Sequence, residues 1–127
     1  MPYQTQSADT PVSYVVRASC GSASLRTSYV QWLVGSAQQF GHMAEVLGAG
    51  ALTAEVVTLD RPEGAQVDET WIAEARYTFR NRAALESYLA EHAPRLRAHG
   101  LAKFGPQGSV GSVQFARFTG ELVRALP

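Results

Sequence analysis

The stretch "TWIAEARYTFRNRAALESYLAEHAPRLRAHGLAKFG", residues 70–105, decides the fold, because a strand pattern in it gives way to a helix pattern. Successive side chains of a strand point to opposite faces. One face of a strand over residues 70–80 must be packed against helices, since it would carry Trp71, Ala73, Ala75, Tyr77 and Phe79. The opposite face would carry Ile72, Glu74, Arg76 and Thr78.

Two helical pieces follow this strand. Asn81 can cap the first piece, in which Leu85 and Tyr88 belong to an apolar stripe at helical spacing. Pro94 removes a helix donor and clashes with the preceding turn, but it is well suited to the first turn of a new helix. The sequence therefore predicts a second helix over residues 93–104, set at an angle to the first.

The rest of the chain predicts three further strands and one long helix. Runs rich in β-branched residues indicate the strands, which are expected over residues 12–19, 51–60 and 112–120. Apolar residues at helical spacing indicate a helix from about residue 25 to residue 47. Gly35 and Gly41 each weaken that helix by roughly 1 kcal/mol relative to alanine, and "RPEGAQVDE" from residue 61 is expected to be a polar turn.

The resulting order, β-α-β-β-α-β, is the split βαβ or ferredoxin-like pattern. The expected fold class is α+β, a four-stranded antiparallel sheet with both helices on one face, and the preference for right-handed crossovers favours this topology. A length of 127 residues suits one domain. We expect that domain over residues 12–127, after a disordered tail at residues 1–11.

Composition excludes several classes of protein. Eleven basic residues balance eleven acidic ones, so net charge draws the chain to neither nucleic acid nor an anionic membrane. No apolar run approaches the roughly 20 residues of a membrane span, and the polar start of the chain lacks the apolar core of a signal peptide. Cys20 is the sole cysteine, which rules out an intramolecular disulfide and favours a reducing compartment. We expect a cytoplasmic protein without nucleic-acid or membrane partners.

The sheet face opposite the helices is expected to mix charged and large apolar side chains. Strand alternation assigns to this open face Val15, Arg17, Glu55, Val57, Ile72, Glu74, Arg76, Phe115 and Arg117. A purely solvated face would rarely carry so many apolar groups. One interpretation is a homodimer interface with structural ion pairs. The other is a ligand cavity in which an arginine grips a carboxylate, phenolate or enolate.

Two segments resemble a known family. "HMAEVLGAGALTAEVV", residues 42–57, and "YTFRNRAALESYLAEHAPRLRAHGLAKFG", residues 77–105, are similar to runs in a bacterial family of small uncharacterised proteins, a domain of unknown function. The second segment matches at Leu85, Tyr88, Ala93, Pro94, Leu96, Arg97, Gly100 and Phe104. The resemblance implies a ferredoxin-like, dimeric α/β-barrel fold and a homodimer, and it implies no activity. It is weaker around the first helix, where Trp32 stands ten residues before His42.

The residues leave binding and catalysis open as alternatives. A binding protein for a small, partly apolar and anionic metabolite would use Arg17, Ile72, Phe115, Arg117 and Trp32. A cofactor-free enzyme of the cyclase, isomerase or monooxygenase type would act on an aromatic or polyketide-like compound. Its candidate catalytic residues are Glu74, Arg76 and His42. A third alternative is an interaction protein without a ligand.

No cofactor or metal is expected. The sequence contains no CxxC, HExxH or phosphate-loop spacing. His42 and Glu45 form an i, i+3 pair, which would need further ligands to bind a metal. We expect this pair on an exposed polar face of the first helix, and we expect Trp32 and Trp71 in the core.

Overall fold

The computed structural model describes residues 9–60, 71–123 and 126. Its elements, in chain order, are β1 (Val12–Cys20), α1 (Ala23–Val34), α2 (His42–Gly48), β2 (Thr53–Leu59), β3 (Trp71–Phe79), α3 (Arg82–Glu91), α4 (Ala93–Phe104) and β4 (Gln114–Glu121). Most of the expected tail and the polar turn after residue 60 lie outside the described residues.

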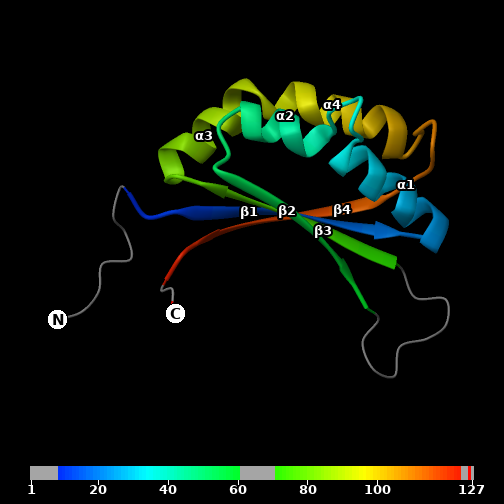
Figure 1. Ribbon diagram of the computed structural model, residues 1–127, viewed down its shortest axis with the longest axis horizontal. Helices are drawn as coiled ribbons and strands as arrows, with labels where there is room; N and C mark the ends of the chain where they lie inside the picture. The colour runs from blue at the N-terminus through cyan, green and yellow to red at the C-terminus, as the bar shows by residue number, and fades with distance from the viewer. Residues whose placement is uncertain (1–8, 61–70, 124–125, 127) are drawn as a thin grey trace.

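The four strands form one antiparallel sheet in the order β2-β3-β1-β4. Figure 1 shows the four helices on the same side of this sheet, with the other side uncovered. The predicted α+β, ferredoxin-like fold with an antiparallel sheet and one helix-covered face is therefore confirmed. We call the two sides of the sheet the helix face and the open face.

The predicted starts of the two helices in the second half are confirmed, whereas the last strand begins two residues later than predicted. The Asn81 side chain accepts a 2.8 Å hydrogen bond from the backbone N–H of Ala84 and so caps α3. Pro94 lies in the first turn of α4, where its missing donor costs nothing. Among the described residues, no helix has the length and apolar character that crossing a membrane would require.

The predicted single helix over residues 25–47 is wrong, because the chain forms two helices there. Gly35 adopts a φ of 78°, which glycine tolerates and which ends α1. An antiparallel bridge between Gly35 and Phe40 then closes a short loop, and α2 begins at His42. The apolar periodicity continued across this loop, which is why the sequence pattern suggested one helix.

The predicted placement of Phe115 and Arg117 on the open face is wrong. Directly opposed residues of antiparallel strands share a face. In the observed register Ala18 lies opposite Phe115 and Val16 lies opposite Arg117, so both residues of β4 belong to the helix face. The sequence was ambiguous here because β4 carries an aromatic residue on each face, with Phe118 on the open one.

The core lies between the helix face and the helices. The alternation predicted for β3 is confirmed, since Ala73, Ala75, Tyr77 and Phe79 are all buried. Tyr29 of α1 meets Phe104 of α4 edge to face, with ring centroids 5.3 Å apart. This contact joins the first helix of the chain to the last one above the sheet.

Candidate functional site

A small pocket lies between the helix face and the helices, and every element except β2 contributes to it. We call it the helix-side pocket. Its volume open to the centres of water molecules is about 40 Å³, which is room for about three waters. Aromatic side chains form most of its wall: Tyr14, Tyr29, Trp32, Tyr77, Tyr88 and Phe115.

Two arginines make the helix-side pocket electropositive. Arg97 of α4 donates a 2.8 Å hydrogen bond from Nη2 to the hydroxyl oxygen of Tyr14. The Arg117 guanidinium lies 5.6 Å from the centroid of the Phe115 ring, within cation–π range. Among the described residues that line the pocket, none is an aspartate or a glutamate. An anion bound here would meet two cations and no competing carboxylate.

Three tyrosines of the pocket, Tyr29, Tyr77 and Tyr88, keep their protons at neutral pH. Burial raises the pKa of Tyr88 to about 12, although the nearby Arg97 opposes the change. Burial likewise raises the pKa values of Tyr29 and Tyr77. These phenols are therefore neutral hydrogen-bond donors rather than negative charges, so the positive character of the pocket is not offset.

His42 begins α2, and its ring stacks on Trp32 with centroids 4.3 Å apart and planes inclined by 17°. The expectation that His42 lies on an exposed polar face is wrong, because the ring lines the helix-side pocket. Burial, and then the charge of His99, lower the pKa of His42 to about 4, so the imidazole is neutral at pH 7. Its Nδ1 atom is buried and has no hydrogen-bond partner.

Gly100 of α4 allows Trp32 to reach this position. A Cβ atom at Gly100 would lie 3.1 Å from Cη2 of Trp32, closer than most carbon contacts in proteins. The glycine that the sequence placed in a family motif thus leaves space for the ring on which His42 stacks. Trp32 and His42 also line a second, more polar hollow of about 450 Å³ beside the loop between α1 and α2, with Gln39, Glu45 and Lys103.

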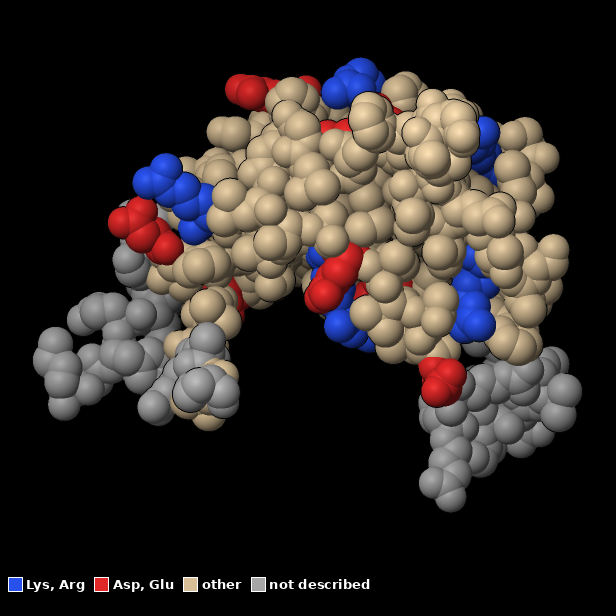
Figure 2. All heavy atoms as spheres, viewed as in Figure 1, with Lys and Arg blue, Asp and Glu red and all other residues tan. Residues whose placement is uncertain are grey.

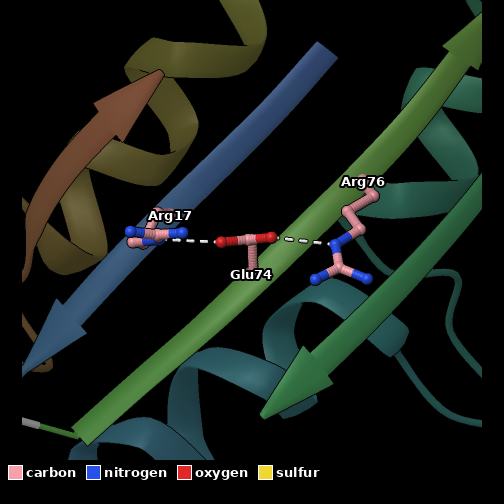
Figure 3. A network of polar contacts seen from close by, with 3 residues as sticks. All are labelled: Arg17, Glu74 and Arg76. Carbon is pink, nitrogen blue, oxygen red and sulfur yellow. Dashed lines mark hydrogen bonds and ion pairs between the residues drawn. The ribbon is translucent and has the colours of Figure 1, made fainter. Parts of the chain in front are cut away.

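The open face carries a separate charged network, drawn in Figure 3. The Glu74 carboxylate accepts hydrogen bonds from Nε of Arg17 at 2.7 Å and from Nε of Arg76 at 2.8 Å. The Glu74 side chain is only 6% exposed. Burial alone would raise the pKa of this carboxyl, but the two arginine hydrogen bonds outweigh burial and lower it. Glu74 is therefore ionised, and both its oxygens are engaged.

A second acid lies beside this network on the open face. Glu55 of β2 lies directly opposite Arg76 in the strand register, so the open face carries a row of alternating charges. Figure 2 shows basic and acidic atoms close together at the concave lower side of the molecule, below the sheet. Apolar side chains flank the row on the same face: Val15, Val57, Leu59, Ile72 and Phe118.

The candidate residues from the sequence thus separate into two groups on opposite faces of the sheet. The helix-side pocket contains Trp32, His42, Phe115 and Arg117. The open face contains Arg17, Ile72, Glu74 and Arg76. A catalytic role for Glu74 and Arg76 stays a prediction, and their pairing on the face away from the pocket gives it no support.

Sequence reasoning missed Tyr14 and Arg97, which line the pocket and are hydrogen-bonded to each other. The available signal was the short helix after Pro94, in which Arg97 stands three residues before Gly100 and so shares a face with it. The part of the chain that the structure describes holds no group of three or more metal-ligating side chains.

The sequence matches no protein-family model, and no curated protein is detectably similar to it. Among solved structures, the chain is similar to SnoaB, a cofactor-independent oxygenase from Streptomyces nogalater. The two are 15% identical, the alignment covers 93% of this chain and 98% of that chain, and the TM-score is 0.48. So distant a likeness carries no argument about activity. Membership of the uncharacterised bacterial family stays a prediction.

Proposed function

We propose that this protein binds a small aromatic anion in the helix-side pocket. The observation that carries the proposal is the pairing of two arginines, Arg97 and Arg117, with aromatic walls and no lining carboxylate among the described residues. Charge-assisted hydrogen bonds from guanidinium to carboxylate are short and strong. Aromatic side chains favour a ring between them, in stacked or edge-to-face arrangements.

The size of the pocket and the hydrogen-bond donors in its wall limit the classes of ligand that it could bind. A volume of about 40 Å³ for water centres is too small for a fused polycycle, and a single ring would need the lining side chains to move apart. The hydroxyl of Tyr14 accepts from Arg97, so its own proton stays available to an anion beside the same guanidinium. A monocyclic aromatic carboxylate or phenolate satisfies these constraints together.

Replacing Arg97 with glutamine tests the proposal. We expect the dissociation constant for benzoate, measured by isothermal titration calorimetry, to rise by about 10- to 100-fold, since a hydrogen bond to a charged group is lost. Arg95→Gln is the matched control, because Arg95 lies on the same helix and pairs with Glu45 at 3.6 Å outside the helix-side pocket. Equal benzoate affinity in wild type and Arg97→Gln, with both folded, would contradict the proposed site.

A cofactor-free enzyme in the same pocket is the second candidate. The neutral imidazole of His42, with an unpartnered Nδ1, supports it, because a pocket base must be unprotonated to accept a proton. Arginines beside the same space would stabilise an oxyanion. Mass spectrometry of the aromatic acids recovered after incubation separates the two candidates: unchanged acids support binding alone, and altered acids support catalysis.

We also propose that two copies of the chain form a homodimer through their open faces. Support comes from the row of alternating charges, in which each acid is flanked by a base, and from the apolar residues beside it. A row of this kind is self-complementary under a two-fold axis, so opposite charges can meet across the interface. Phe118 is 50% exposed on this face, and Arg17 lies 5.5 Å from its ring centroid.

Phe118→Lys is expected to weaken this dimer at least about tenfold, because it removes an apolar anchor and adds a cation beside Arg17. Sedimentation velocity over a concentration series measures the change. Phe40→Lys is the control, since Phe40 is 88% exposed and lies in the loop between α1 and α2, away from the sheet. A wild-type chain that sediments as a monomer throughout, or a Phe118→Lys variant that associates like wild type, would refute the interface.

A further inference from the structure

We infer that His42 selects the ligand of the helix-side pocket: Nδ1 accepts a hydrogen bond from a hydroxyl or N–H group of the ligand, so the site prefers hydroxylated aromatic anions to their unsubstituted parents. This inference rests on the proposed function and adds a second recognition element to it. The arginines would bind the anionic group of the ligand. His42 would accept a hydrogen bond from a donor group elsewhere on the ligand's aromatic ring.

The geometry sets His42 apart among the buried polar groups of the described residues. Its ring lines the pocket and is held at one angle by stacking on Trp32, with centroids 4.3 Å apart. Among the buried side-chain nitrogen and oxygen atoms of the described residues, only His42 Nδ1 lacks a hydrogen-bond partner. Buried polar atoms of native proteins are nearly always satisfied, and exceptions often mark functional positions.

The other side chains that line the pocket indicate which kind of ligand group would pair with Nδ1 of His42. Arg97 and Arg117 offer only donors, and the protonated tyrosines add more. A neutral imidazole has one donor and one acceptor nitrogen, and its commoner tautomer carries the proton on Nε2. His42 is then an acceptor in a pocket otherwise rich in donors, and it complements a ligand hydroxyl.

A ligand without such a group would leave Nδ1 buried and unpaired in the complex. Sites built to hydrogen-bond a hydroxyl discriminate strongly against analogues that lack it, because the unpaired group of the protein retains its desolvation cost. Purely apolar contacts discriminate much less. The preference for a hydroxylated ligand over its unsubstituted parent is therefore expected to be large, although the two ligands differ by a single hydroxyl group.

The test compares benzoate with its three monohydroxy isomers by isothermal titration calorimetry on the full chain. At least one isomer is expected to bind wild type about 10- to 100-fold more tightly than benzoate. His42→Phe keeps a flat ring on Trp32 and is expected to reduce that preference to about threefold or less. His99→Phe is the control with the same substitution on the exposed side of α4. It removes the charge that helps lower the His42 pKa, but burial is the larger cause and keeps His42 neutral at pH 7, so this variant should keep the wild-type preference.

Nitrogen-15 NMR of wild type provides a readout that needs no variant. We expect Nδ1 of His42 to be unprotonated in the free protein and to shift on addition of the preferred hydroxybenzoate, but not of benzoate. A proton found on Nδ1, or no preference for any hydroxy isomer while Arg97→Gln still weakens benzoate, would overturn the inference and leave the proposed function standing. Failure of all four acids to bind in an Arg97-dependent way would overturn both.

Discussion

Replacing Phe104 with alanine is expected to lower the free energy of unfolding by about 3–5 kcal/mol. Phe104 is 1% exposed, and its ring meets Tyr29 at 5.3 Å and Trp32 at 5.6 Å between centroids. Truncation would leave a cavity behind two side chains that form the wall of the helix-side pocket. Chemical denaturation monitored by circular dichroism measures the loss.

The same experiment on Phe40→Ala supplies the reference. Phe40 is 88% exposed, so its truncation removes almost no buried contact and should change stability by no more than about 0.5 kcal/mol. Similar losses in the two variants would contradict the core described for α1 and α4. A Phe104→Ala variant that stays folded should also bind benzoate more weakly, because Tyr29 and Trp32 lose their support.

Replacing Gly41 with alanine is expected to destabilise the protein by about 1–3 kcal/mol, or more if the loop cannot relax. A Cβ atom at this position would lie 2.4 Å from the carbonyl oxygen of Leu33 and 2.5 Å from the nitrogen of Gly35. These are backbone atoms, so they move only if the loop between α1 and α2 changes shape. Thermal and denaturant unfolding measure the effect.

Gly48→Ala provides the matched control, because Gly48 is the last residue of the short helix that Gly41 precedes, and it has open space where a Cβ would be built. That change is expected to be neutral or to stabilise by up to about 1 kcal/mol. Equal tolerance of alanine at both positions would show that the close approach of Gly35 and Gly41 is not required. Since His42 follows Gly41 directly, its pKa should also rise from about 4 in Gly41→Ala, which proton NMR titration detects.

The fold was predictable where one local pattern dominated. In β3 only one face could be buried, and Pro94 could only begin a helix, so the second half of the chain was assigned with nearly correct bounds. The first half failed where two patterns competed. Gly35 and Gly41 interrupt an apolar periodicity that by itself favours one continuous helix, and only the contact between their backbones shows that the chain turns there.

The candidate site was predictable only in part, because its residues are far apart in the chain and their faces depend on strand register. Trp32, His42, Phe115 and Arg117 were named from sequence, but Phe115 and Arg117 were assigned to the wrong side of the sheet. β4 is an edge strand with an aromatic residue on each face, so alternation alone cannot orient it. The hydrogen bond between Arg97 and Tyr14 joins residues 83 positions apart, which no local pattern predicts.

The stacking of Trp32 on His42 also makes the intrinsic fluorescence of Trp32 sensitive to the state of His42. The chain has two tryptophans, and the other, Trp71, lies beneath the Arg26 guanidinium at 4.9 Å rather than in the pocket. Excited indole is quenched efficiently by a protonated imidazole in contact with it and far less by a neutral one. The emission of Trp32 therefore reports directly on the charge and contacts of His42, without a dye or a label.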